Sequence, residues 1–223
     1  YILVDSTTEA MKKIARFYRE HLRIKVVGIT GSVGKTSTKE MISAVLSQKF
    51  NVLKTEGNFN NEIGLPLTIL RIRREHEVAV VEMGISEFGE MHRIAKVAKP
   101  DICVMTNIGQ CHLENLIDRD GVLRAKSEIF DFLKPDGHIV LNGNDDKLIT
   151  VQEVKGVKPV FYYVEDSTAQ KADLLLTYGA HSVRTVTGAI TGGMSPKNAE
   201  HFDTHEDLAR LLKMRAAEGD VIL

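Results

Sequence analysis

A run of small residues followed by a Lys-Thr pair is the part of this sequence that most clearly carries chemistry. Residues 26–37 read VVGITGSVGKTS. The apolar run 24–29 predicts a buried strand, and residues 36–48 predict a helix. A strand, a glycine-containing loop, Gly-Lys-Thr and a helix form the arrangement known as a phosphate-binding loop (P-loop). We therefore expect this loop to bind a nucleotide.

The residue types in the P-loop match the chemistry of a polyphosphate. Gly31 and Gly34 allow backbone N–H groups to turn toward phosphate oxygens, and the positive end of the following helix assists them. Lys35 can reach the outer phosphates, and the Thr36 hydroxyl can ligate Mg²⁺. The residues expected to contact ATP in this loop are Thr30, Gly31, Ser32, Val33, Gly34, Lys35, Thr36 and Ser37.

The loop departs from the general P-loop pattern in one place. That pattern has a glycine five residues before Gly34, where this chain has Ile29, and the glycine lies at Gly28 instead. The alternative is a chance glycine-rich turn ahead of a helix. The predicted strand before the loop and the predicted helix after it favour a P-loop over that alternative.

The composition limits the classes of protein to which the chain can belong. Of its 223 residues, 43% are hydrophobic and 26% are charged, and the net charge is −1. This balance argues against a general nucleic-acid or membrane-surface binder, because both need a basic excess. No apolar run approaches the ~20 residues of a membrane span, and no signal peptide opens the chain. Two cysteines do not make a disulfide framework, so we expect a cytoplasmic globular protein with reduced thiols.

Strands and helices alternate from residue 24 to about residue 161. The runs 78–82 and 102–105 are continuously apolar, which favours strands covered on both faces, and hence a mostly parallel α/β sheet flanked by helices. Ligands of such folds gather at the carboxyl ends of the strands. The predicted strands are 24–29, 51–54, 78–82, 101–106, 138–142 and 159–162, and the predicted helices are 36–48, 64–71, 89–98, 119–133 and 145–154.

The regions on either side of this unit are predicted to belong to other domains. Residues 1–23 carry a helix that Asp5 or Ser6 can cap, after an apolar strand at 1–4, and we expect them to be the end of a preceding domain or a linker. Residues 24–163 form the expected central domain, and 164–223 form part of a second, Rossmann-like α/β domain. In that part an apolar run lies at 174–176, and we predict helices at 181–191 and 204–217, a turn at 192–193 and a strand at 220–223.

A loop rich in asparagine follows the second predicted strand. Residues 55–66 read TEGNFNNEIGLP, with Asn58, Asn60 and Asn61 within four positions. Asparagine favours loops over strands and helices, and its amide suits recognition of an uncharged polar group or a phosphate. The alternative is a turn that caps a helix beginning at Gly64.

A carboxylate ends the apolar strand 78–82. Burial of Glu82 alone would cost several kcal/mol, so its carboxylate needs a partner. Magnesium held by Thr36 is the partner that the P-loop suggests, with Glu82 as a direct or water-mediated ligand. A structural salt bridge is the alternative.

Three further residues are candidates with weaker signals. His112 follows a strand end on the expected ligand side, where an imidazole can complete a metal site. The adjacent Cys111 suggests zinc, but one Cys-His pair without a second is a weak signal. Lys126 lies on a predicted helix with mixed faces, and taken alone we predict that its side chain is solvated. Asn142 follows a strand, and we expect its amide to be free for a purine edge, unless residues 142–146 form a hairpin turn.

Taken in order, these motifs resemble the ATP-binding central domain of the Mur ligase family. The resemblance covers about residues 24–162, and the family places its P-loop glycine as this chain does. Residues 174–223 resemble a later portion of the family's carboxy-terminal domain. The segments that carry the main resemblance are GITGSVGKT at 28–36, NFNNEIGLP at 58–66, EMG at 82–84, TNIG at 106–109 with His112, AKSEIF at 125–130, and NGNDD at 142–146.

The resemblance implies a role for each polar candidate around the phosphates. Lys35 and the loop amides hold the β- and γ-phosphates of ATP. Thr36 and Glu82 serve one Mg²⁺, and His112 helps to hold a second. Lys126 matches a lysine that many family members carry as a carbamate, which reverses its interpretation as a solvated residue. The implied catalytic residues are Lys35, Glu82, His112 and Lys126.

The resemblance implies substrate contacts as well. Asn142 matches a position near the adenine. The asparagine loop, with Asn58 and with Asn60 or Asn61 at its centre, is expected to face the acyl substrate and the phosphate.

The activity that the resemblance implies is an ATP-driven amide ligation in peptidoglycan precursor synthesis. The motifs are closest to the branch of the family that joins D-alanyl-D-alanine to UDP-N-acetylmuramoyl-tripeptide through an acyl phosphate. A sibling ligase, a folylpolyglutamate synthetase-like enzyme and a P-loop ATPase switch or binding module are the alternatives. We expect a monomer that binds no nucleic acid. The sequence shows neither the family's domain for the UDP-sugar nor the first part of its carboxy-terminal domain, so we expect the 223-residue chain alone to bind nucleotide weakly and to ligate nothing.

Overall fold

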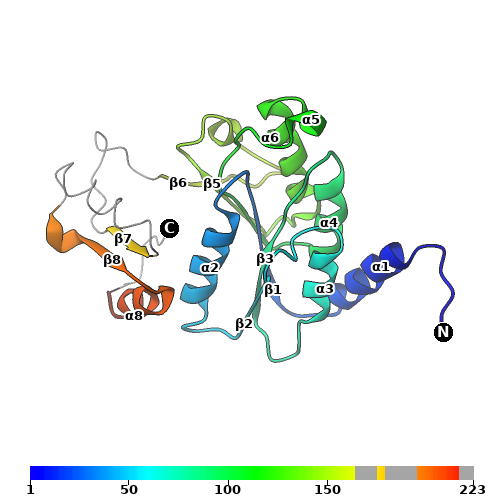
Figure 1. Cartoon of the computed structure of the whole chain (residues 1–223), viewed down its shortest axis with the longest axis horizontal. Coiled ribbons are helices and arrows are strands. Elements are labelled where there is room, and N and C mark those ends of the chain that lie inside the picture. The colour runs from blue at the N-terminus through cyan, green and yellow to red at the C-terminus, as the bar shows by residue number, and fades with distance from the viewer. Residues whose placement is uncertain (164–174, 179–194, 216–223) are drawn as a thin grey trace.

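A six-stranded sheet in which every strand is parallel to its neighbours positions the P-loop. The computed structural model describes residues 1–163, 175–178 and 195–215. The strand order is β2-β3-β1-β4-β5-β6, with β1 at the centre (Figure 1). The strands are β1 (Lys25–Thr30), β2 (Val52–Lys54), β3 (Val78–Glu82), β4 (Ile102–Met105), β5 (His138–Asn142) and β6 (Val160–Tyr162). The predicted α/β fold with a parallel sheet is confirmed.

Helices cover both faces of this sheet. On one face lies α2; α3 and α4 lie on the other (Figure 1). In chain order the helices are α1 (Thr7–Glu20), α2 (Lys35–Leu46), α3 (Gly64–Leu70), α4 (Glu90–Ala98), α5 (Leu113–Leu116) and α6 (Arg119–Ser127), with short 3₁₀ turns η1 (Glu128–Phe132) and η2 (Leu148–Thr150).

Two apolar layers hold the helices to the sheet. The smaller layer contains Val27 and Ile29 of β1, against which Ile42 and Leu46 of α2 pack. The larger layer, on the opposite face, joins Val26 of β1 to α3, α4 and α6. Successive residues of a strand point to opposite faces, so β1 contributes to both layers. This burial on both faces explains the continuously apolar strands.

A smaller β-unit follows in the described part of the chain. It comprises β7 (Leu175–Tyr178) and β8 (Ala199–Phe202), which pair in parallel, with the 3₁₀ turn η3 (Pro196–Asn198) before β8. The helix α8 (His205–Arg215) confirms the predicted helix at 204–217 over its described residues and packs against α2. The helix, turn and strand predicted at 181–191, 192–193 and 220–223 lie outside the described residues.

The predicted helix at 145–154 is wrong. The segment contains only the turn η2, because the Asp145 carboxylate accepts hydrogen bonds from the backbone N–H groups of Lys147 and Leu148, both at 2.9 Å. Its other oxygen accepts from the Ile108 N–H at 2.8 Å, which ties the segment to the loop after β4. Side-chain bonds of this kind favour turns over helices.

Two other predictions at the level of secondary structure need correction. The strand expected at 1–4 is absent: Tyr1, Ile2 and Leu3 are fully or almost fully exposed and pair with no strand in the described ranges. The helix expected at 119–133 stops at Ser127 and continues as η1. There the Glu128 carboxylate turns away to accept the N–H groups of Gly89 and His92, at the amino end of α4. The predicted cap Ser6 does accept the Glu9 N–H at the start of α1.

Candidate functional site

The P-loop lies between the carboxyl end of β1 and the amino end of α2. Gly34 precedes α2 in the left-handed region at φ 80°. Gly31 has φ 149°, and a Cβ atom on it would lie 1.9 Å from Thr106 Oγ1. The loop therefore requires glycine at position 31, both for its backbone angle and for the close approach of the segment that follows β4.

We expect Gly31→Ala to destabilise the protein and to weaken nucleotide binding. Backbone strain and overpacking each typically cost about 1–3 kcal/mol, so a loss of about 2–4 kcal/mol in the free energy of unfolding should result. Gly57→Ala is the matched control, since Gly57 also has a positive φ, 49°, but no atom lies within 4 Å of the position that a Cβ would take there. The control should cost about 1 kcal/mol. Urea denaturation and ADP titration of both variants check this; equal losses in the two would contradict the steric argument.

The segment after β4 fixes the conformation of the P-loop. Asn107 Oδ1 accepts the N–H groups of Ser32 (3.1 Å) and Val33 (2.9 Å), and its Nδ2 donates to the Val33 carbonyl. Thr106 Oγ1 donates to the same carbonyl at 2.6 Å. Asn107 was not among the predicted site residues, although its position after a strand end was a signal. The N–H groups in the first turn of α2 take no part in these bonds and have no intrahelical acceptor, so they are available to a phosphate.

Lys35 is folded back onto the loop that precedes it. Its Nζ donates to the Gly31 carbonyl at 2.9 Å and to the Ser32 carbonyl at 3.5 Å. Backbone carbonyls are neutral acceptors, so a phosphate oxygen would compete for this ammonium with a full negative charge. Lys35 is thus placed to transfer from the loop to a bound nucleotide.

Thr36 and Glu82 come together as predicted. Glu82, at the end of β3, is 3% exposed, and Thr36 Oγ1 donates to its Oε2 at 2.8 Å. Its other oxygen, Oε1, accepts from Asn60 Nδ2 at 2.8 Å. Within the described residues Glu82 has only neutral partners, so the alternative of a structural salt bridge is not what the structure contains.

This pair of oxygens fits a magnesium ion. A buried carboxylate with neutral partners is favourable for a cation, because its charge is otherwise uncompensated. Ligands at 2.0–2.1 Å in an octahedron lie about 2.9 Å apart, which is near the observed spacing of Thr36 Oγ1 and Glu82 Oε2. At the start of the loop, the fully buried Thr30 Oγ1 has no hydrogen-bond partner among the described residues.

The described residues contain no group of three or more His, Cys, Asp or Glu side chains that could hold a metal ion. A magnesium site here must therefore combine one carboxylate and one hydroxyl with phosphate oxygens and water, as is usual for Mg²⁺. The zinc site suggested by Cys111 and His112 gains no support in this part of the chain. His112 itself is exposed, has φ 51° and precedes α5, so its role at a second metal stays a prediction.

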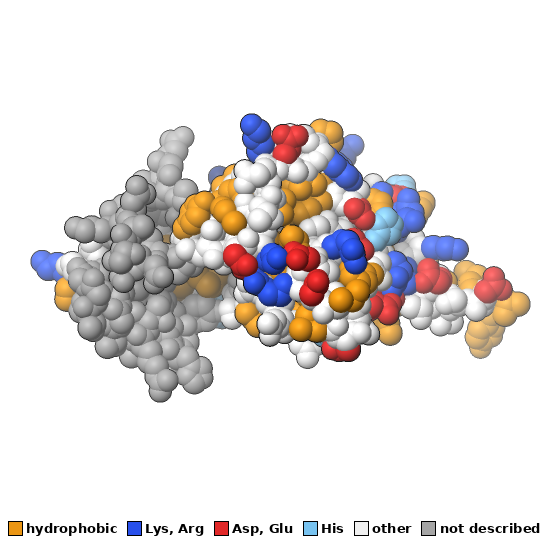
Figure 2. Space-filling view, turned by 90° about the horizontal axis from the view of Figure 1, so that it is seen from above, with side chains coloured by type: hydrophobic (Ala, Val, Ile, Leu, Met, Phe, Trp, Pro, Cys, Tyr) orange, Lys and Arg blue, Asp and Glu red, His pale blue; other side chains and the backbone are white. Residues whose placement is uncertain are grey.

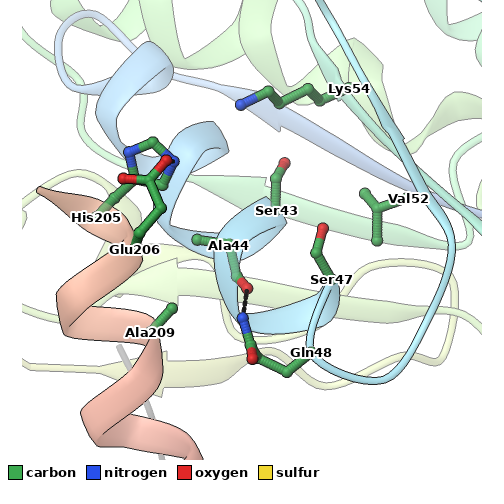
Figure 3. Close-up of a pocket in the computed structure, with 9 residues that line it drawn as sticks. All are labelled: Ser43, Ala44, Ser47, Gln48, Val52, Lys54, His205, Glu206 and Ala209. Atoms are coloured by element: carbon green, nitrogen blue, oxygen red, sulfur yellow. Dashed lines mark hydrogen bonds and ion pairs between the residues drawn. The ribbon is translucent and has the colours of Figure 1, made fainter.

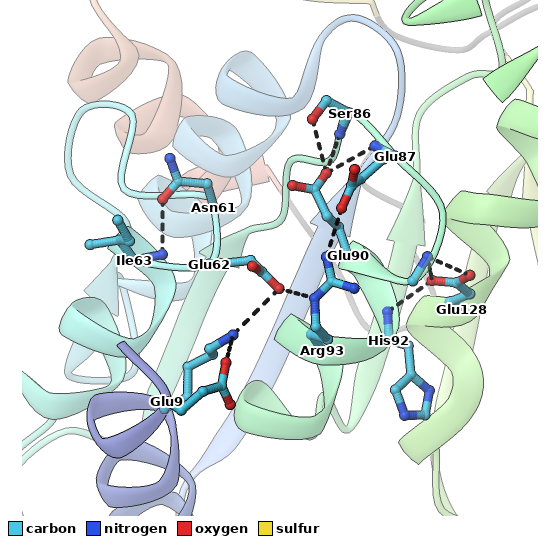
Figure 4. A network of polar contacts seen from close by, with 12 residues as sticks. Glu9, Asn61, Glu62, Ile63, Ser86, Glu87, Glu90, His92, Arg93 and Glu128 are labelled. Carbon is cyan, nitrogen blue, oxygen red and sulfur yellow. Dashed lines mark hydrogen bonds and ion pairs between the residues drawn. The ribbon is translucent and has the colours of Figure 1, made fainter. Parts of the chain in front are cut away.

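Two neighbouring residues of the asparagine loop, Asn60 and Asn61, make different contacts. Asn60 points to Glu82, while Asn61 Oδ1 accepts the N–H groups of Ile63 (3.1 Å) and Gly64 (2.9 Å) at the start of α3. The capping interpretation thus holds for Asn61, whereas Asn60 contacts Glu82 and its contact with a substrate or phosphate stays a prediction. Glu62 is bound by Arg93 and lies 3.6 Å from Lys12 of α1 (Figure 4). Asn58 makes no side-chain hydrogen bond with the described chain, and its contact with substrate stays a prediction.

The two asparagines should respond differently to alanine. Asn61→Ala removes a cap and should cost about 1 kcal/mol of stability with little effect on turnover. Asn60→Ala frees one oxygen of Glu82 and should lower turnover by about tenfold or more while stability changes less. Steady-state kinetics and thermal unfolding of both variants test this pairing. A larger loss of turnover in Asn61→Ala than in Asn60→Ala would contradict the assignment.

Lys126 is buried, contrary to the prediction from the residue alone. It is 2% exposed, and its pKa is lowered to about 8, chiefly by burial; Cys111 acts to raise the pKa, and the nearby charge of Lys35 acts to lower it. The hydrophobic neighbours Val122 and Ala125 on α6 direct this part of the helix into the larger core. A lysine held in this way beside Lys35 fits a functional amine and not a solvated one.

Asn142 lies at the end of β5 and joins two loops. Its Nδ2 donates to the Thr106 carbonyl at 3.0 Å, and its Oδ1 accepts the Asn144 N–H at 3.0 Å. Arg119 donates to the Ile108 carbonyl at 2.8 Å and pairs with Asp146, which fixes the same two loops from the other side. One N–H of the Asn142 amide remains for a ligand, and its place near a purine stays a prediction.

Two pockets of about 200 Å³ each lie away from these residues. One lies between α2 and α8 and includes Ser43 and His205 (Figure 3). The other lies between α1 and α4 and includes Lys12 and Arg93. On the face seen from above, acidic and basic side chains lie intermixed near the centre (Figure 2). The candidate site is thus a polar edge of the sheet and not either of these pockets.

The chain is similar to known ligases in sequence and structure. Residues 29–195 match the Mur ligase middle domain. The UDP-N-acetylmuramoyl-tripeptide–D-alanyl-D-alanine ligase of Bacillus subtilis is 48% identical over 147 residues, which cover 66% of this chain and 32% of that protein. The Escherichia coli protein of the same name is 34% identical, over 85% of this chain and 43% of its own. The crystal structure of MurF ligase from Thermotoga maritima in complex with ADP is 35% identical, with a TM-score of 0.66 over 73% of this chain and 38% of that one. The chain thus spans about a third to two fifths of the length of these relatives.

Proposed function

Because this chain belongs to the Mur ligase family, we propose that it serves as the ATP-binding part of a ligase that joins D-alanyl-D-alanine to UDP-N-acetylmuramoyl-tripeptide. The relatives from B. subtilis and E. coli carry this activity in their names. The observation that supports the proposal most directly is the Glu82 carboxylate, held by Thr36 and Asn60 beside the first turn of α2. That group fits ATP with Mg²⁺, and the asparagine loop brings a second polar element to the same place.

The proposed reaction begins with binding of ATP at the P-loop. The N–H groups in the first turn of α2 receive the phosphates, and Lys35 moves from the Gly31 carbonyl to an outer phosphate oxygen. Thr36 and Glu82 would hold Mg²⁺, which supplies neutralisation of charge on the phosphates. Glu82 stays oriented during turnover because Asn60 binds its second oxygen.

The two chemical steps need positioning more than a nucleophilic side chain. The terminal carboxylate of the peptide attacks the γ-phosphoryl group, ADP leaves, and an acyl phosphate forms. The amine of D-alanyl-D-alanine then displaces phosphate through a tetrahedral intermediate and loses a proton. Both steps bring anions together, so Lys35 contributes electrostatically to each. We assign Lys126 a carbamate, since the low pKa of its amine leaves more of the neutral form that reacts with CO₂.

The remaining assignments follow from the same proposal. His112 would help to hold a second Mg²⁺, Asn142 would face the adenine, and Asn58 would border the acyl substrate. Precursors linked to UDP and the ATP that activates them are made in the cytoplasm, and we place the protein there. The structure has no helix, among the residues it describes, that is long and apolar enough to cross a membrane.

The proposal is tested by measuring phosphate release by the protein at the full length that the cell produces. The assay contains ATP and Mg²⁺ and offers UDP-N-acetylmuramoyl-tripeptide, with lysine or diaminopimelate as third residue, with and without D-alanyl-D-alanine. Release that requires both substrates is the expected result. Release that depends on another amino acid would favour a sibling ligase or a folylpolyglutamate synthetase-like enzyme. Release that is indifferent to both substrates would leave a P-loop ATPase switch and overturn the proposal.

A further inference from the structure

Glu62 links the asparagine loop to two helices. Its Oε1 accepts a hydrogen bond from Arg93 Nε on α4 (Figure 4). The same oxygen lies 3.6 Å from Lys12 Nζ on α1. Lys12 is buried and the Glu62 side chain is 26% exposed, so water and salt screen these contacts only in part. Glu62 is therefore held by two cations, each from a different helix.

The helix that carries Arg93 is a firm base for this contact. Met91, Ile94 and Ala95 of α4 are fully buried in the larger apolar layer, and α1 packs against both α3 and α4. Residues 55–63, in contrast, contain no helix or strand. The position of the loop thus depends on its side-chain and main-chain contacts, and those of Glu62 are the ones between full charges.

The contacts of Asn60 transmit the position of the loop to the candidate site. The Asn60 carbonyl accepts the Gly84 N–H at 2.8 Å, and its Nδ2 donates to Glu82 Oε1 at 2.8 Å. A Cβ atom on Gly84 would lie 3.1 Å from Asn60 Cγ, so the amide is closely fitted against the segment that follows β3. Because only two peptide units separate Asn60 from Glu62, a shift of Glu62 would move Asn60 away from these contacts.

We propose that Glu62 is a positioning residue: Arg93 and Lys12 hold it, and it keeps the asparagine loop where Asn60 binds the Glu82 carboxylate. The inference rests on the proposed function, in which Glu82 serves Mg²⁺. A loop released from Arg93 would visit positions in which one oxygen of Glu82 is unbound, and the carboxylate would then be less well oriented. Groups that orient a metal ligand or a reacting group contribute to catalysis without touching the substrate.

Glu62→Gln is the variant that tests this role. It keeps the volume of the side chain and removes the charge that attracts both cations. Lys12 then keeps Glu9 as a partner at 2.5 Å. Arg93 keeps Glu87 at 3.0 Å, so neither cation is left alone and the fold should persist. Glu87→Gln is the matched control, because it removes the other carboxylate on the same guanidinium, outside the asparagine loop and 57% exposed.

Hydrogen exchange reports the position of the loop without nucleotide or metal. The full-length protein is labelled with ¹⁵N-glycine, and NMR follows the exchange of the Gly84 N–H, which bonds to the Asn60 carbonyl. We expect Glu62→Gln to speed this exchange about fivefold or more, because the loop opens more often. Glu87→Gln should change it by less than about twofold, as expected of an exposed ion pair. Unchanged exchange in Glu62→Gln would overturn the inference.

A double-mutant cycle tests whether the effect on ligation passes through Asn60. The kcat of Glu62→Gln should fall about fivefold, and that of Glu87→Gln should stay within about twofold of wild type. In an Asn60→Ala background, Glu62→Gln should lower kcat by less than about twofold, because the contact that it supports is already absent. Losses that combine independently in the double variant would overturn the inference.

Failure of the proposed function has a different signature. Wild-type protein that releases no phosphate in the presence of both substrates would overturn that function. The exchange of the Gly84 N–H in Glu62→Gln and Glu87→Gln would then still decide whether Glu62 holds the loop, since this measurement needs neither ATP nor turnover.

Discussion

Glu82→Gln is expected to lower turnover of the ligase by about 10³-fold, equivalent to about 4 kcal/mol of transition-state stabilisation. Among the described residues, Glu82 is the only carboxylate that bonds to Thr36, and its second oxygen is bound by Asn60. Glutamine keeps the volume but removes the charge that balances Mg²⁺. It also replaces one carboxylate oxygen by an NH₂ group, so either Thr36 or Asn60 loses the oxygen to which it now donates a hydrogen bond. The loss should therefore be measurable in kcat and in a raised requirement for Mg²⁺.

The fold should tolerate this substitution. A buried carboxylate with neutral partners is unfavourable by itself, so its replacement by an amide should leave the unfolding free energy nearly unchanged. Glu87→Gln is the control: this carboxylate follows on the same loop, but its side chain is 57% exposed and pairs with Arg93. The control should retain turnover within about twofold. Initial rates over a Mg²⁺ titration test this prediction. A Glu82→Gln enzyme with near wild-type kcat would show that Glu82 is not a ligand of the metal.

Local patterns in the sequence were sufficient for most of the central sheet. The run 78–82 lacks alternation, and the structure explains this by burial of β3 on both faces. The helix after the P-loop was predicted from residue 36 and begins at Lys35. These features depend on residues close together in the chain, which sequence periodicity reports directly.

Features that depend on distant residues were not predictable in this way. Residues 145–154 have a helical pattern, but Asp145 binds the backbone of Ile108, a partner 37 positions away, and the segment forms a turn. Residues 1–4 are apolar like a strand, yet no described strand pairs with them. The short helix α5 was missed because four residues carry too little pattern.

The candidate site shows the same division. Thr36 and Glu82 were expected to meet because both follow carboxyl ends of strands in one parallel sheet, and they do. Composition did not separate Asn60 from Asn61, since neighbouring loop residues point in different directions and only the fold decides which one faces the site. Lys126 looked solvated because its burial comes from contacts that its own helix does not reveal.

Lys126→Met should reduce turnover and change how stability depends on pH. The pKa of Lys126 is lowered from 10.5 to about 8, mainly by burial. Between these two values the unfolded state binds more protons than the folded state, so the unfolding free energy of the wild-type protein rises with pH across this window. The total rise is roughly 3 kcal/mol, and it is complete only above the pKa of the unfolded lysine. Methionine carries no charge, and the variant lacks this contribution.

The comparison of the two proteins isolates this contribution. At pH 7 the variant should be at least as stable as the wild-type protein, and from pH 8 to pH 10 the wild-type protein should gain on it by roughly 2 kcal/mol. Lys96→Met, at an exposed position on α4, is the control and should show no such change between the two pH values. Urea denaturation at both pH values measures these differences. A constant gap between wild type and Lys126→Met would mean that the lysine keeps an ordinary pKa.

The loss of activity has a separate chemical signature. Turnover of Lys126→Met should fall by about 10–100-fold, the range typical of groups that support a metal site. With ¹³C-labelled bicarbonate, the wild-type protein should give a carbamate signal in its NMR spectrum that the variant lacks. Since the neutral amine is the form that reacts, the signal should grow as the pH rises toward 8. Loss of turnover without any carbamate signal in the wild-type protein would assign the effect to the ammonium itself, acting beside Lys35 on the phosphates.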